Sequence, residues 1–166
     1  MNWWKWLLSA LILLLTLSAA AIYSLLYLSL PDYNGSLTSS INNTARLERD
    51  ALGYLSIHAA NRNDAAFALG FAHAQERFFQ MDILRRNAAG ELAELFGERA
   101  LNADKKLRTH RFRQRARQAL AALPDNQRQL LSNYRLGVNE GLAALSIKPF
   151  EYLLLGQNPA GWQDVS

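Results

Sequence analysis

The sequence predicts an α+β protein, a mainly helical segment with one β-hairpin, preceded by a transmembrane or signal-anchor helix. Three patterns indicate this fold class. No charged residue occurs from Trp6 to Leu30, short alternating segments surround Gly53, and apolar residues recur at every third or fourth position from Phe67 to Leu95. After the first segment about 136 of the 166 residues remain, which is enough for one small folding unit.

Residues 1–31 are interpreted as a membrane anchor or signal segment that contacts the membrane through residues 3–30. The uncharged run is long enough to cross a bilayer as a helix of about 20 residues. Lys5 and the small residues Ser18–Ala21 would also suit a cleaved signal, but the apolar run continues beyond them, which favours an uncleaved anchor. Lys5 precedes the run and Asp32 follows it, so the bulk of the chain is expected on the periplasmic or extracytoplasmic side.

Residues 32–44 are rich in Asn, Gly, Ser and Thr, which is typical of a linker. The folded part is therefore expected over residues 45–166. It begins with "ARLERDALGYLSIHA", in which the turn Asp50–Gly53 separates two short alternating segments. This pattern predicts a β-hairpin with Gly53 at a position that needs a positive φ angle.

A long helix is predicted next, with Asn61 as its N-cap and Asp64 three residues later. Gly90 would cost about 1 kcal/mol in a helix interior, so a break or a tight contact is expected there, and the helix is expected to end at Gly97. Its apolar seam consists of Phe67, Phe71, Ala74, Phe78, Met81, Leu84, Ala88, Leu92 and Leu95. Two further helices are predicted, Glu98–Leu123 and Asp125–Leu145.

Composition and motifs exclude several kinds of chemistry. The chain has no cysteine, hence no disulfide or thiolate, and it has no phosphate-binding glycine loop, HExxH pair, GxSxG elbow or EF-hand loop. His58 and His110 lie beside no evident nucleophile, and no catalytic or metal-binding residue is assigned. The arginines between Lys105 and Gln118 fan out around a helix, which favours a solvated or partner-facing surface over a nucleic-acid partner.

The stretch "GFAHAQERFFQM" from Gly70 to Met81 has the residue types of an active site. His73, Arg77 and Gln80 would share one face of the helix, beside the apolar seam. Such a row serves either catalysis or a structural hydrogen-bond network, and the physical argument favours the network. An i,i+4 ion pair of Asp82 with Arg86 is also predicted.

Several segments together resemble the start of the penicillin acylase family of N-terminal-nucleophile hydrolases, which includes penicillin amidases and acyl-homoserine lactone acylases. They are "LERDALGYLSIHA", "ALGFAHAQERFFQMDILRRNAAGELAELFG", Asp104 with Arg108, "YRLGVNEGL" and "PFEYLLLGQNPAGW". The resemblance covers Leu47 to Trp162 and departs at Leu55-Ser56, where the family usually has Pro-His. The family-motif residues, each expected to be structural, are Arg49, Asp50, Gly53, His73, Gln75, Arg77, Gln80, Arg85, Arg86 and Gly90.

The resemblance implies that residues 45–166 are an incomplete α-chain portion of an αββα fold. The parent enzyme would hydrolyse linear amide bonds, which are carbon–nitrogen bonds other than peptide bonds. Its substrates would be β-lactams, acyl-homoserine lactones or related amides. Hydrolysis of β-lactams would give the enzyme a role in antibiotic metabolism. The family's catalytic serine begins a separate β chain, so it is expected outside this sequence, and this chain alone is expected to be inactive. Substrate-binding residues are unassigned.

The partners implied are the membrane, the rest of the precursor (the remaining α chain and the β chain) and a small-molecule amide. No cofactor is expected in this chain, although the resemblance allows Ca²⁺ in the complete enzyme. The chain is interpreted as a fragment of a longer product rather than as a truncated gene. The alternative hypothesis is a self-contained, membrane-tethered helical binding module without catalysis.

Overall fold

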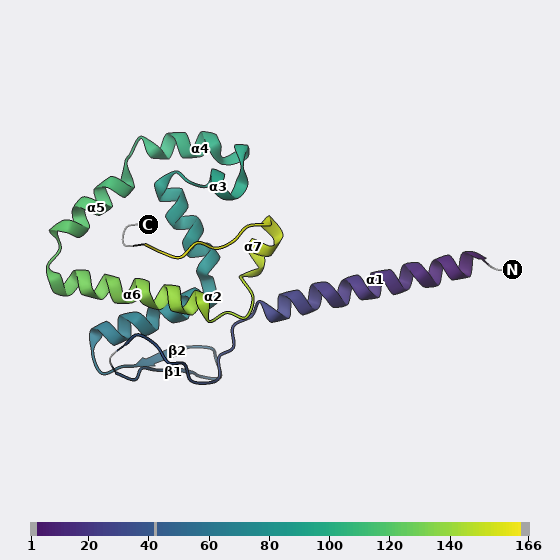
Figure 1. The fold of residues 1–166 in the computed structure, drawn as a ribbon, viewed down its shortest axis with the longest axis horizontal. Helices are drawn as coiled ribbons and strands as arrows, with labels where there is room; N and C mark the ends of the chain where they lie inside the picture. The colour runs from purple at the N-terminus through teal and green to yellow at the C-terminus, as the bar shows by residue number, and fades with distance from the viewer. Residues whose placement is uncertain (1–2, 42, 164–166) are drawn as a thin grey trace.

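The computed structural model describes residues 3–41 and 43–163, and shows a helical body with a hairpin at one end and one long helix projecting from it (Figure 1). The projecting helix is α1 (Trp3–Leu28), and none of its residues is buried. Its one charged residue is Lys5, near its start, and its mean hydropathy is 2.2. By length and composition α1 could cross a bilayer.

The hairpin consists of β1 (Arg46–Arg49) and β2 (Leu55–His58), which pair antiparallel. Asp50 organises the turn, because its carboxylate accepts hydrogen bonds from two backbone N–H groups at 2.9 and 2.8 Å. Gly53 has a φ of 86°, as predicted. A mainly helical chain with one two-stranded hairpin is thereby confirmed.

Helix α2 (Arg62–Ala89) begins where the sequence predicts, with the side chain of Asn61 accepting two hydrogen bonds from backbone N–H groups of the first turn. It ends earlier than predicted. Gly90 takes the left-handed conformation that closes a helix, with φ 71°, so the expected end at Gly97 is wrong. Helix α2 is also not continuous, because Arg77 has non-helical angles (φ −147°, ψ 29°) and kinks it.

The single helix predicted over 98–123 is wrong, because the structure has two. After the short α3 (Ala93–Phe96) come α4 (Glu98–Arg108) and α5 (Phe112–Ala122). Arg111, with φ 52°, adopts the left-handed conformation between α4 and α5 and turns the chain there. Helix α5 has no buried residue, and it bridges α4 and α6 at the edge of the molecule opposite α1 (Figure 1).

Helix α6 (Asp125–Ala143) begins at Asp125 as predicted and ends two residues before the predicted Leu145, and α7 (Phe150–Leu155) completes the body. Helices α2 and α6 approach closely because glycines lie where they cross. A Cβ atom on Gly137 would be 2.0 Å from the carbonyl oxygen of Phe67, and one on Gly70 would be 2.1 Å from that of Tyr134. Only glycine fits at either position.

The core lies between α2, α6 and α7. Its buried apolar residues are Phe67, Ala68, Ala72, Ala74, Phe78, Leu95, Val138 and Tyr152. The predicted seam is thus covered in part, with Phe67, Ala74, Phe78 and Leu95 buried. Its residues Phe71 and Met81 are only half-buried, Ala88 is exposed and Leu84 is 68% exposed. Within the described residues the apolar seam is therefore not covered along its whole length.

The segment between α1 and the hairpin and the segment after α7 both contact α6. Ser40, in the predicted linker, donates its hydroxyl hydrogen to Glu140 at 2.5 Å. After α7 the chain returns across α2 (Figure 1). Trp162 is fastened there by Asn139, which accepts a hydrogen bond from its backbone N–H at 2.7 Å and donates one to its carbonyl oxygen at 2.9 Å.

Candidate functional site

Asp82 is the centre of a buried polar network in the second half of α2, with a side chain that has no exposed surface. Arg85 donates two hydrogen bonds to its Oδ1, at 3.0 and 2.6 Å. Arg86 donates to its Oδ2 at 2.7 Å, and the hydroxyl of Tyr152 in α7 donates to the same oxygen at 2.5 Å. Arg86 also pairs with Glu94. The predicted Asp82–Arg86 pair is therefore present, but buried.

The network fixes the charge states of its members. Burial alone would raise the pKa of Asp82, but the hydrogen bonds from Tyr152, Arg86 and Arg85 outweigh burial and hold that pKa below its usual value. Burial opposes the charge of Arg86, yet its hydrogen bonds and attraction to Asp82 and Glu94 raise its pKa. Burial and the adjacent carboxylate raise the pKa of Tyr152. None of these groups would exchange a proton near neutral pH, so the network has a structural role and joins α2 to α7 and α3.

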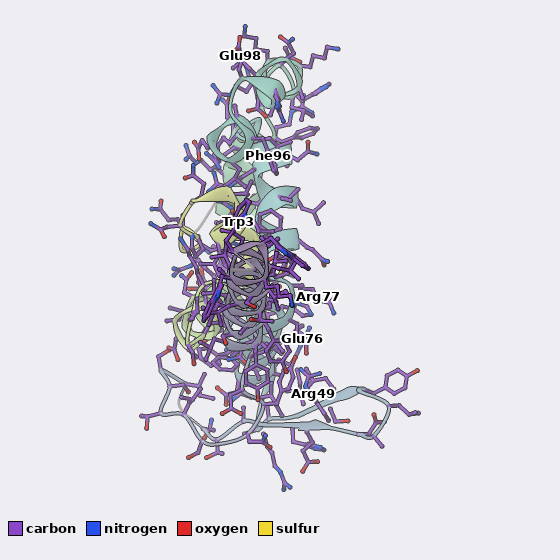
Figure 2. All side chains as sticks on the ribbon, turned by 90° about the vertical axis from the view of Figure 1, so that its right-hand side faces the viewer. Trp3, Arg49, Glu76, Arg77, Phe96 and Glu98 are labelled. Carbon is purple, nitrogen blue, oxygen red and sulfur yellow. The ribbon has the colours of Figure 1, made fainter. Side chains whose placement is uncertain are left out.

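A second cluster lies at the kink of α2. Arg49 of the hairpin pairs with Glu76, and its guanidinium lies 4.3 Å from the ring centre of Tyr33. Arg77, half of whose side chain is exposed, lies 3.6 Å from the same carboxylate. Figure 2 views the molecule from the side where α1 projects and shows Arg49, Glu76 and Arg77 in order from the hairpin upward. Gln75 and Gln80 line the adjoining hollow of about 550 Å³.

His73 lies away from this cluster, since its ring points to α6. Its Nδ1 and the hydroxyl of Tyr134 share a hydrogen bond of 2.9 Å. Burial, and then the charge of Arg77, lower the pKa of His73, so the neutral imidazole is favoured. The predicted polar row is thus divided by the kink, because His73 contacts α6 while Arg77 and Gln80 line the hollow.

Gly90 joins α2 to α4. A Cβ atom there would be 2.6 Å from Cγ of Arg108 and 2.8 Å from the carbonyl oxygen of Asp104, so both expected effects, a helix break and a tight contact, are confirmed. Arg108 donates a hydrogen bond to the carbonyl oxygen of Gly90 at 2.8 Å. The carboxylate of Asp104 accepts from the backbone N–H groups of Leu92 at 2.9 Å and Ala93 at 2.7 Å.

These clusters offer fixed charges and hydrogen bonds rather than an activated nucleophile. His58 lies 3.4 Å from Glu48 at the surface, and the ring of His110 stacks on Phe112. Within residues 3–41 and 43–163, no hydrogen bond joins a histidine to a serine. The described residues also contain no group of three or more His, Asp or Glu side chains that could hold a metal ion.

Sequence reasoning missed the partners that complete each cluster. Tyr152 is part of the apolar run "YLLL", and Tyr134 lies in the predicted helix Asp125–Leu145 without any sign of a polar partner. A hydroxyl-bearing aromatic within an apolar run is a signal for a buried hydrogen bond. Glu76 and Asp82 do not form a pair of carboxylates, since Glu76 lies at the kink hollow and Asp82 in the core.

Comparison with known proteins gives consistent results. The sequence model of the penicillin amidase family matches residues 44–166. Penicillin acylase 2 proenzyme from Pseudomonas sp. (strain SE83) is 37% identical over 150 residues, which are 90% of this chain and 19% of the proenzyme. Acyl-homoserine lactone acylase QuiP from Pseudomonas aeruginosa is 40% identical over 119 residues, 70% of this chain and 14% of that protein.

Among solved structures, a thermostable penicillin G acylase from Alcaligenes faecalis matches with a TM-score of 0.67 at 25% identity. The match covers 74% of this chain and 67% of that chain. The helical body with its hairpin is thus an arrangement found in a penicillin acylase, whereas the chain spans less than a fifth of the length of the curated relatives it matches.

Proposed function

The chain belongs to the penicillin amidase family, and we propose that it is the N-terminal portion of an amidohydrolase that hydrolyses linear amide bonds. The candidate substrates are β-lactams, acyl-homoserine lactones or related N-acyl amides, because relatives named for penicillins and for acyl-homoserine lactones both match. The observation that carries the proposal is the family match over residues 44–166 together with the shared fold.

Within such an enzyme the role proposed for this chain is structural. The family-motif residue Arg86 pairs with Glu94 of α3, and Gly90 packs closely against α4. Arg85 binds the buried Asp82 within α2, and Arg49 joins the hairpin to α2. The nucleophilic serine is proposed to lie in the rest of the precursor, at the start of a β chain, where its own α-amino group would act as the base. The hairpin and the body would be part of the complete αββα fold.

We assign α1 the role of a membrane anchor that holds the enzyme on the extracytoplasmic side. An apolar helix of 26 residues is sufficient to span the hydrocarbon core of a bilayer. Lys5 before the span supports this orientation. Protease added to sealed, right-side-out membrane vesicles should degrade the body after α1, and protection of the body would contradict the orientation.

The hydrolase proposal is tested by reconstitution. The purified 166-residue chain should release no amine from a penicillin or an N-acyl-homoserine lactone, because the nucleophilic serine is proposed to lie outside it. Mixed with the separately expressed remainder of the SE83 proenzyme, it should restore hydrolysis of at least one of these amides. If the intact SE83 proenzyme is active in the same assay and the mixture is not, the proposal fails, and the membrane-tethered binding module becomes the better description.

A further inference from the structure

An apolar hollow of about 330 Å³ lies between the second half of α2 and α5. We call it the α2–α5 groove. The residues that matter in its lining are Met81, Leu84, Ala88, Phe112, Ala116 and Trp162. Leu84 is 68% exposed and Phe112 is 42% exposed, so two large apolar side chains face solvent in one depression. Apolar surface gathered in this way marks an interaction site more often than scattered apolar residues do.

The packing around the groove is incomplete. Helix α5 has 11 residues and none of them is buried, although Phe112 and Ala116 are four residues apart on one face. A helix of this length is marginal in water unless a partner covers its apolar face. Trp162 supports the same conclusion, because its buried Nε1–H has no hydrogen-bond acceptor among the described residues.

The charge around the groove indicates the chemistry of the occupant. From Lys105 to Pro124 the sequence contains lysines and arginines but no aspartate or glutamate. Arg113 pairs with Glu91, whereas Arg115 and Arg117 on α5 are exposed. An occupant with carboxylates beside an apolar side chain would therefore match this surface.

A polypeptide fits this position better than a lipid surface does. Figure 1 shows α5 at the edge of the body opposite the end from which α1 projects. If α1 spans a bilayer, α5 is held on the far side of the body from that bilayer. The curated relatives have several times the length of the part that this chain matches, so a large polypeptide is available to cover the groove.

We propose that the α2–α5 groove is the docking site of the remaining polypeptide of the acylase precursor. That polypeptide inserts an apolar side chain between Leu84 and Phe112 and presents carboxylates to Arg115 and Arg117. The inference rests on the proposed function, because it takes the partner to be the rest of an amidohydrolase. It adds to that function the surface through which the two parts join.

The test uses the full chain in lipid nanodiscs, with the SE83 proenzyme lacking its matched region as the probe. Leu84→Glu and Phe112→Glu should each weaken binding of the probe by at least tenfold, since each places a charge in the groove. Leu154→Glu is the matched control, because Leu154 is 78% exposed on α7, outside the groove. The affinity of the Leu154→Glu chain for the probe should stay within twofold of that of the parent chain. A photo-crosslinking residue at position 84 should capture the probe directly.

The outcomes separate docking from activity. Absence of binding, or equal weakening by Leu84→Glu and Leu154→Glu, overturns the docking site. Binding through the groove without amide hydrolysis supports the docking site and contradicts the proposed function. Hydrolysis that Leu84→Glu leaves unchanged supports the function and overturns the docking site. A chain that is dimeric until Leu84→Glu makes it monomeric assigns the groove to a second copy, which also overturns the proposal.

Discussion

Replacing Asp82 by asparagine would keep the shape of the side chain and remove its negative charge. In the folded protein this carboxylate is fully buried and accepts hydrogen bonds from Arg85, Arg86 and Tyr152. An amide has one acceptor oxygen in place of two, and its nitrogen cannot accept from Arg86 or from the tyrosine hydroxyl. The substitution therefore leaves two largely buried guanidinium groups without their shared anion.

Removal of one partner from a buried ion pair typically costs about 3–5 kcal/mol, because the remaining charge has lost its solvation and its partner. Side-chain exposures of 11% for Arg85 and 6% for Arg86 place this network in that class. With about 2–4 °C lost per kcal/mol in a domain of this size, the thermal midpoint should fall by roughly 10 °C. Since the pKa of Asp82 is lower in the folded state, its contribution is complete above the unfolded pKa and disappears as pH falls through the folded pKa.

The measurement is urea unfolding of the full chain in detergent micelles, followed by circular dichroism at neutral pH. Asp125→Asn is the matched control, because Asp125 also pairs with an arginine three residues later but has a side chain that is 91% exposed. It should cost no more than about 0.5 kcal/mol. If Asp82→Asn costs no more than Asp125→Asn, the reasoning about burial is refuted.

Three further substitutions test the remaining contacts by the same unfolding assay. Gly137→Ala should cost more than about 3 kcal/mol, because its Cβ would be 2.0 Å from the carbonyl oxygen of Phe67. Gly97→Ala has open space around it and should cost less, about 1–3 kcal/mol, from its backbone angles alone (φ 65°, ψ −150°). An equal loss for both glycines would contradict the close helix crossing. Tyr152→Phe should cost about 1–2 kcal/mol through its lost hydrogen bond to the buried carboxylate, and a neutral result would show that the bond contributes little. The parent chain should lose stability as pH falls below about 6.5, because the lowered pKa of His73 means that the unfolded state binds more protons, and His73→Asn should remove that loss.

Local features were predictable because their causes lie within a few residues. The uncharged run specifies α1, Asn61 begins α2 with its side chain, and Gly53 supplies the positive φ of the hairpin turn. The spacing of Asp82 and Arg86 likewise indicates their ion pair. The family was recognisable for the same reason, since its motif is contained in short contiguous segments.

The sequence by itself therefore determined the anchor-like helix, the hairpin, the start of α2 and the family. The tertiary structure alone decided the kink at Arg77, the turn at Arg111 and the partnership of Tyr152 with Asp82, whose residues are 70 positions apart. The physical reason is that periodicity records which residues are apolar but not which element covers them. Helix α7 folds back over one part of α2 and leaves Leu84 exposed, and only the packing of distant elements decides that difference.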